Sequence, residues 1–297
     1  MTTLRNMYPQ KYRESIPDYL ALIRFDRPIG TYLLLWPTLW ALWIAAEGLP
    51  DFKLLVIFIL GTFLMRSAGC IINDYADRDI DGQVTRTANR PIATGRINPK
   101  EALIFCAALC LIAFVLVLLT NQKTIFLSFA AVALTGCYPF MKRYTYFPQV
   151  VLGAAFSWGI PMAFAAQRDE LPPQLWLLYI AALLWTVAYD TFYAMVDRDD
   201  DLKIEVKSTA ILFGNNDRII TGILQAGVIF LLLLVGGQFQ LGYWYLGGVI
   251  SATCLFVYQQ YLIRYRKRDD CFKAFLNNHR VGAIVFIGIF LNYFFSA

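Results

Sequence analysis

Nine long runs of apolar residues occupy most of the chain and restrict it to one kind of fold. The runs lie at roughly 22–46, 52–74, 102–120, 124–141, 147–167, 174–196, 219–237, 242–263 and 281–296. Each is close to the roughly 20 residues that a helix needs to cross the hydrocarbon layer of a bilayer. Strands of a membrane barrel are about half as long and alternate strictly, which these runs do not do. The sequence therefore predicts an all-α polytopic membrane protein with nine transmembrane helices.

The charged residues indicate how these helices are oriented. Only 16% of the residues are charged and 58% are hydrophobic, which excludes an ordinary soluble domain. The N-terminal flank, from Arg5 to Arg27, and the even-numbered connections hold most of the lysines and arginines. The odd-numbered connections hold only Lys53, Lys123 and Arg168. Because cytoplasmic loops collect positive charge, we expect the N-terminus and the even-numbered connections to be cytoplasmic.

Two short acidic segments follow apolar runs and share one pattern. Residues 77–81 read Asp-Arg-Asp-Ile-Asp and residues 197–201 read Asp-Arg-Asp-Asp-Asp, with 120 residues between equivalent positions. An ionisable side chain at membrane depth costs roughly 2.5–3.5 kcal/mol, so such clusters need a cation, a metal ion or a water-filled cavity. We interpret the two segments as one divided active site. The chain, 1–297, is then a single domain of two related halves, with aspartate-rich loops near 73–100 and 197–218.

Arg66 is an intramembrane arginine in register with the first acidic segment. Positions 66, 73, 77 and 81 are separated by seven, four and four residues, so they lie near one face of a helix and its extension. Arg66 either neutralises the aspartates or binds the carboxylate of a small anionic substrate through its planar guanidinium.

Other basic and aromatic residues can complete the site. Arg86 and Arg90 follow the first acidic segment and suit either inside-positive charge or a diphosphate site in which Mg²⁺ bridges carboxylates to phosphate. Tyr138 and Lys142 are one helical turn apart and can face the same cavity. Arg27 is either an interfacial anchor or a contact to an anionic headgroup.

The combination of acids, cations and apolar walls fits a substrate that is both a diphosphate and a lipid. Mg²⁺ takes one or two carboxylates together with substrate phosphate, so two clusters suit two ions. A neutralised diphosphate is a better leaving group, and charge that develops on an allylic carbon is delocalised. The sequence shows no serine-histidine or cysteine-histidine arrangement for a protein nucleophile. We therefore expect metal-assisted ionisation of an allylic diphosphate.

The paired acidic motifs resemble those of a known family. Asn-Asp-x-x-Asp-x-x-x-Asp at 73–81 and Asp-x-x-x-Asp at 197–201 look like the motifs of the UbiA superfamily of intramembrane prenyltransferases. Segments 26–30, 86–91, 193–201 and 207–210 resemble its bacterial 4-hydroxybenzoate polyprenyltransferase branch. The resemblance covers almost the whole chain. It implies nine helices around a central cavity, with a cytoplasmic cap made by the two polar loops, in the bacterial inner membrane.

The resemblance also implies an activity and a set of site residues. The activity is Mg²⁺-dependent transfer of a polyprenyl group from polyprenyl diphosphate to the ring carbon ortho to the hydroxyl of 4-hydroxybenzoate, in ubiquinone biosynthesis. The metal ligands would be Asn73, Asp77, Asp81, Asp197 and Asp201, and the four aspartates among them would be catalytic. Arg27, Arg86, Arg90 and Lys142 would help to bind the diphosphate. Arg66 would bind the aromatic carboxylate, and Tyr138 would lie near the site.

One residue departs from the pattern of this branch. Glu205 stands where a glycine is usual, and glycine would permit a tight backbone turn there. The substitution is either a neutral loop variant or a change that affects activity, because it adds an acid close to the second cluster.

Three other functions stay open from the sequence alone. In an ion-coupled transporter, acidic residues would be expected near mid-bilayer in separate helices. In this chain the acidic residues cluster at helix ends beside basic residues. A quinone- or lipid-binding scaffold would explain a cavity but not the duplicated acids. A prenyltransferase of the same superfamily with another aromatic acceptor would need the metal site, and only an acidic acceptor would need Arg66.

Overall fold

The computed structural model describes the backbone of residues 10–296 and the side chains of residues 16–295. Arg5, which was counted in the basic N-terminal flank, lies outside the described residues. Within the described range the chain is helical and has no β-strand. The first half contains α1 (Gln10–Leu22), α2 (Ile29–Ala46), α3 (Phe52–Asp77), η1 (Asp81–Gln83), α4 (Pro99–Val117), α5 (Gln122–Met141), α6 (Pro148–Ser157) and α7 (Gly159–Arg168). The second half contains α8 (Leu175–Lys203), α9 (Thr209–Phe213), η2 (Gly214–Asn216), α10 (Asp217–Gln238), α11 (Tyr243–Leu262), η3 (Ile263–Tyr265) and α12 (Arg268–Ser296).

The predicted number of membrane spans is confirmed. In the described part of the chain, nine helical segments are long and apolar enough to cross a membrane. They are α2, α3, α4, α5, α6 with α7, α8, α9 with α10, α11 with η3, and α12. The division of the chain into a single domain stays a prediction.

Local sequence explains where several spans begin and break. The side chain of Asp51 accepts a hydrogen bond from Leu54 N at 3.0 Å and so caps the start of α3. Asn98 and Asn121 cap α4 and α5 in the same way. The fifth span is divided into α6 and α7 close to Pro161, because proline cannot donate a hydrogen bond to the preceding turn.

Two helices reach further than the apolar runs predict. The sixth run was expected to end at 196, but α8 continues to Lys203 and carries the whole second acidic segment. The ninth run was expected to begin at 281, but α12 begins at Arg268, with Asp269 and Asp270 in its first turn. Hydropathy does not detect such polar extensions, and acidic residues stabilise the start of a helix through its dipole.

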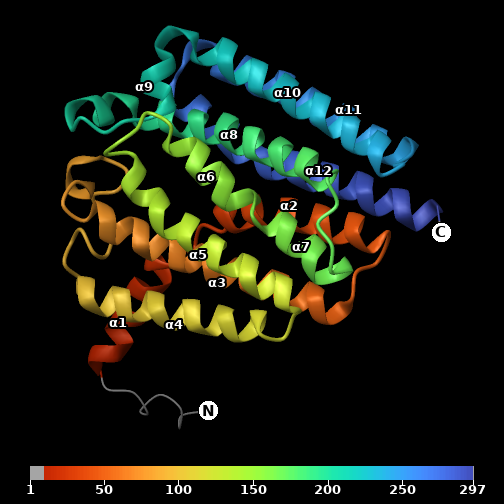
Figure 1. The fold of residues 1–297 in the computed structure, drawn as a ribbon. Helices are drawn as coiled ribbons and strands as arrows, with labels where there is room; N and C mark the ends of the chain where they lie inside the picture. The colour runs from red at the N-terminus through yellow and green to blue at the C-terminus, as the bar shows by residue number, and fades with distance from the viewer. Residues whose placement is uncertain (1–9, 297) are drawn as a thin grey trace, which may run out of the picture.

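The helices pack so that the polar connections lie together. α10 and α11 lie along the outer side of α8 and α12, while α4 lies against α3 at the opposite edge (Figure 1). The connection after α3 and the segment around α9 lie at the same end of the bundle (Figure 1). In the core, the rings of Trp40 and Trp185 stack with centroids 5.3 Å apart and so join α2 to α8.

Buried amide side chains join the last three helices. Gln225 of α10 donates to Gln259 Oε1 of α11 at 2.8 Å, and Gln259 donates to Asn277 Oδ1 of α12 at 2.9 Å. The next residue, Asn278, accepts a hydrogen bond from Trp185 Nε1 of α8 at 2.8 Å. We call these four polar residues, Gln225, Gln259, Asn277 and Asn278, the amide ladder. It satisfies buried polar groups that lipid could not satisfy.

Candidate active site

A cavity of about 1440 Å³ lies at the centre of the bundle. Its polar end is lined by residues such as Asn73, Arg86, Arg90 and Asp197. Its remaining wall is largely apolar and includes Leu33, Phe58, Val132 and Phe156. A cavity with one charged end and an apolar body suits a molecule with an ionic head and a hydrocarbon tail.

The first acidic segment places its carboxylates at the end of α3 and in η1. Asp77 is buried and forms an ion pair with Lys142, while its Oδ1 atom has no hydrogen-bond partner among the described residues. Asp81, also buried, accepts hydrogen bonds from Arg90 Nη1 at 2.8 and 2.9 Å. Burial raises the pKa of the Asp81 carboxyl above its ordinary value, and the nearby Arg90 limits that rise.

Asp74 links the first acidic segment to the N-terminal part of the chain. Its carboxylate receives hydrogen bonds from Arg24 Nη2 at 2.6 and 2.9 Å and lies 3.1 Å from Arg90 Nη1. Arg90 also pairs with Asp81, so four alternating charges form one chain from Arg24 to Asp81. Asp74 was not among the predicted ligands, and its two cationic partners explain how a fully buried carboxylate is stabilised here.

The second acidic segment remains helical and faces the first. Asp197 accepts hydrogen bonds from Arg86, with Nη2 at 2.6 Å and Nε at 3.1 Å, in a bidentate arrangement. The Arg86 guanidinium also lies 4.4 Å from the centre of the Tyr193 ring. Asp201 lies one turn beyond Asp197 on α8 and is half-buried.

Two basic residues bring the two clusters together. Arg86 follows the first acidic segment in the chain but pairs with Asp197 of the second. Lys142, at the end of α5, pairs with Asp77 and also acts electrostatically on Asp201. The prediction of one divided site is therefore consistent with the positions of both segments.

The oxygen-rich side chains fit a divalent metal ion. Carboxylate and amide oxygens are the ligands that Mg²⁺ prefers, and Asp77 Oδ1 is a buried oxygen without a partner among the described residues. In the described part of the chain, no three His, Cys, Asp or Glu side chains are grouped as a ready-made metal site. The basic partners described above neutralise the carboxylates instead. The predicted ligand set of Asn73, Asp77, Asp81, Asp197 and Asp201 stays a prediction.

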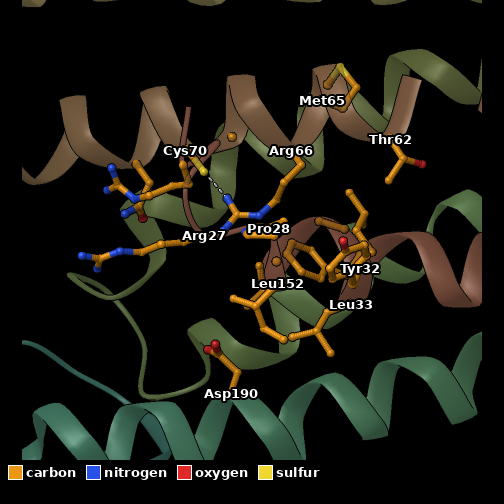
Figure 2. A pocket seen from close by; sticks show the side chains of 18 of the residues that line it. Arg27, Pro28, Tyr32, Leu33, Thr62, Met65, Arg66, Cys70, Leu152 and Asp190 are labelled. Carbon is orange, nitrogen blue, oxygen red and sulfur yellow. Dashed lines mark hydrogen bonds between the residues drawn. The ribbon is translucent and has the colours of Figure 1, made fainter. Parts of the chain in front are cut away.

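Arg66 lies on the cavity wall with most of its hydrogen-bonding capacity unused. Figure 2 shows its guanidinium close to α2, with one hydrogen bond, from Nη1 to Cys70 Sγ. Its Nε atom is buried and has no hydrogen-bond partner among the described residues. Arg66 also forms no ion pair within 4 Å in the described chain, although the aspartates were one of its two expected partners.

Some of the predicted site residues line the cavity and others do not. Arg27, Arg66, Asn73, Arg86, Arg90, Tyr138 and Asp197 line the cavity. Within the described chain, Asp77, Asp81, Lys142 and Asp201 are not part of its wall, although Asp81 pairs with Arg90, which is. The Arg27 side chain is 70% exposed and pairs with the adjacent Asp26 at 3.3 Å, so it lies at the rim.

Sequence reasoning did not select two polar residues that line the cavity from α8. Asp190 faces the cavity from the side opposite Arg66 (Figure 2). The buried hydroxyl of Tyr189 has no hydrogen-bond partner among the described residues. The sequence spacing could have indicated Asp190, because it precedes Asp197 by seven residues, just as Arg66 precedes Asn73. A carboxylate in this position can accept a proton from a bound molecule.

Fold and site together define a multi-pass helical membrane protein whose cavity joins a charged end to an apolar interior. The sequence model of the UbiA prenyltransferase family matches residues 34–288. The 4-hydroxybenzoate octaprenyltransferase of Ectopseudomonas mendocina is 61% identical over 276 residues, which cover 93% of each chain. The enzyme of that name from Aeromonas salmonicida is 62% identical over 275 residues, 93% of this chain and 95% of the relative. The chain belongs to the UbiA prenyltransferase family.

Solved structures share the fold. The apo structure of a UbiA homolog from Aeropyrum pernix has a TM-score of 0.78 and 23% identity, covering 89% of this chain and 98% of that one. A UbiA homolog from Archaeoglobus fulgidus bound to GPP and Mg²⁺ has a TM-score of 0.69 and 18% identity, covering 93% and 99% of the two chains. The predicted all-helical fold is thus confirmed.

Proposed function

We propose that this chain transfers a polyprenyl group from polyprenyl diphosphate to the ring carbon ortho to the hydroxyl of 4-hydroxybenzoate, a step of ubiquinone biosynthesis. The observation that carries the proposal is the convergence of two acidic segments and their basic partners at one end of an apolar cavity. Relatives of about 60% identity over more than 90% of the chain carry the name 4-hydroxybenzoate octaprenyltransferase, which supports this acceptor.

The charged end of the cavity binds the diphosphate. Asn73, Asp77, Asp81, Asp197 and Asp201 would hold Mg²⁺, and the ion would supply charge neutralisation of the leaving diphosphate. Arg86, Arg90 and Lys142 contribute positive charge, and Arg27 at the rim attracts the anionic head as it enters. The site needs no protein nucleophile, because loss of a neutralised diphosphate leaves an allylic cation whose charge is delocalised.

The remaining wall binds the tail and the acceptor. Apolar residues surround the isoprenoid chain and exclude water, which would otherwise capture the cation. Tyr138 presents its ring to the developing positive charge. Arg66 binds the carboxylate of 4-hydroxybenzoate, and its unpaired, partly buried guanidinium supports this role over neutralisation of the aspartates.

The chain's place in the membrane follows from its charge distribution. The basic N-terminal flank and even-numbered connections favour a cytoplasmic location for the N-terminus and for both aspartate-rich loops. These loops form a cytoplasmic cap over the charged end of the cavity. The bacterial relatives support the inner membrane as the location.

The direct test is an assay with defined substrates. Membranes that contain the chain are incubated with Mg²⁺, octaprenyl diphosphate and 4-hydroxybenzoate, and the product is identified by mass spectrometry. We expect prenylated 4-hydroxybenzoate, and none when EDTA is added. Product with a naphthoate or homogentisate acceptor, and none with 4-hydroxybenzoate, would overturn the acceptor while keeping the reaction class. Formation of product in the presence of EDTA would overturn the role of the metal.

A further inference from the structure

Gly30, the second residue of α2, lies directly against the guanidinium of Arg66. A methyl group added at Gly30 would lie 2.7 Å from Arg66 Cζ and closer still to Nε and Nη2. Carbon atoms in proteins pack at about 3.5–4.0 Å, so the methyl group and the guanidinium cannot occupy these positions together. Glycine at this position therefore makes the observed location of the guanidinium possible.

The clash would displace a side chain and leave the backbone in place. The three nearest atoms to the added methyl group all belong to the end of the flexible Arg66 side chain. Gly30 also lies within α2, where alanine is a better helix former than glycine. Alanine at this position should consequently keep the fold and move the guanidinium.

Hydrogen bonds do little to fix the guanidinium where it lies. Its hydrogen bond to Cys70 Sγ uses a weak acceptor, and its Nε atom has no partner among the described residues. The location of the guanidinium therefore depends on packing. The atoms nearest to a side chain added at Gly30 are those of this guanidinium. A change of one methyl group at this position can therefore decide where the positive charge is presented.

We propose that Gly30 is a positioning residue that sets the location of Arg66 and thereby the selectivity for an acidic aromatic acceptor. The inference rests on the proposed function, in which Arg66 binds the acceptor's carboxylate. Bidentate binding of a carboxylate requires both nitrogen donors in a fixed geometry, so displacement of the guanidinium weakens acceptor binding. Diphosphate binding depends on other residues and should change little.

The test compares Gly30→Ala with a matched control in another helix. Gly136 lies inside α5, is not on the cavity wall, and has open space around an added methyl group. We expect Gly30→Ala to raise the KM for 4-hydroxybenzoate about tenfold to 100-fold and to change the KM for polyprenyl diphosphate less than about twofold. Gly136→Ala should leave both constants within about twofold.

A double variant separates positioning from a general loss of structure. In the Arg66→Ala background there is no guanidinium to displace, so Gly30→Ala should raise the acceptor KM by less than about twofold more. An unchanged acceptor KM in Gly30→Ala would overturn the proposal. So would an equal rise in both KM values, or the same additional rise in the Arg66→Ala background.

A binding measurement distinguishes failure of this inference from failure of the proposed function. Calorimetric titration of the purified protein with 4-hydroxybenzoate requires no turnover. If the wild-type chain binds but does not prenylate this acid, the proposed function fails, while weaker binding by both Gly30→Ala and Arg66→Ala would still support positioning. Loss of binding in Arg66→Ala with full binding in Gly30→Ala would overturn the inference alone. Absence of binding by the wild-type chain would overturn the inference, and the product assay would decide the proposed function separately.

Discussion

The two acidic segments share one pattern of residues but have different structures. In the first, α3 ends at Asp77, and the chain turns through η1 so that Asp81 reaches Arg90. In the second, α8 continues through the whole segment, so Asp197 and Asp201 lie one turn apart on a helix. A repeated motif therefore indicates repeated chemistry without repeated backbone structure.

The arginines at the second position of the two segments, Arg78 and Arg198, differ in burial and in their partners. Arg78 is exposed and lies 4.6 Å from the centre of the Tyr75 ring. Arg198 instead pairs with Asp217, which is fully buried at the start of α10 and also pairs with Arg266. The second segment is thus tied to the C-terminal helices, whereas the first is tied to the N-terminal part through Asp74 and Arg24.

The largest expected effect is on turnover, and it tests the role of the aspartate that begins each segment. Asp77→Ala and Asp197→Ala should each lower turnover at least about 100- to 1000-fold, because each removes a carboxylate proposed to hold Mg²⁺ and so weakens the neutralisation of the leaving diphosphate. Matched controls are available two residues further on, since the Asp79 and Asp199 side chains are 72% and 76% exposed. Asp79→Ala and Asp199→Ala should keep turnover within about twofold. Normal turnover in Asp77→Ala or Asp197→Ala, measured with folded protein, would contradict the shared role.

A smaller effect, on the free energy of unfolding, tests the difference between the arginines of the two segments. Arg198→Ala removes one of two arginine partners of the buried Asp217 and should lower the free energy of unfolding by about 2 kcal/mol. Arg78→Ala, at the equivalent exposed position, should change it by less than about 0.5 kcal/mol. Both values can be measured by denaturant unfolding in detergent micelles. Equal effects would show that the two arginines have equivalent roles after all.

The smallest effect concerns the connections that follow the two segments. Glu205 has a φ of 56°, a left-handed conformation that costs a residue with a side chain roughly 1–2 kcal/mol, whereas the first connection places Gly95 at a φ of 73°. Glu205→Gly should therefore raise the free energy of unfolding by about 1 kcal/mol, and Gly95→Ala should lower it by a similar amount. Turnover of Glu205→Gly, measured alongside, separates a neutral loop variant from one that affects activity. No change in unfolding for either variant would show that these turns are not strained.

Much of the fold followed from the sequence because hydropathy is a local property. The number of spans depends on residues within single segments, and it is confirmed for the described part of the chain. The length of α8 beyond 196 was missed because hydropathy does not detect a helix once it becomes polar. The pairing of Arg86 with the second segment, 111 residues away, depends on how separate helices pack.

The site was predictable as a set of residue types and less so as a set of contacts. Arg66 and Tyr138 were selected from helical spacing, and both line the cavity. Lys142, which was expected to face the same cavity as Tyr138, is not part of its wall in the described chain. The contact of Arg66 with Gly30 joins two helices and leaves no periodic signal in either. Asp74 is next to the expected ligand Asn73 in the sequence. Its pairing with two arginines, Arg24 and Arg90, became visible only in the structure.

The amide ladder has a consequence for how the C-terminal helices find their arrangement. Between helices in lipid, apolar surface alone does not favour a helical neighbour over a lipid tail. Gln225, Gln259 and Asn277 form hydrogen bonds only when their three helices are rotated so that the amides meet. Rotation of any one helix by about 100°, the angle of one residue, would leave a buried amide unsatisfied. Neutral amides thus specify the rotational register of α10, α11 and α12 independently of pH and salt.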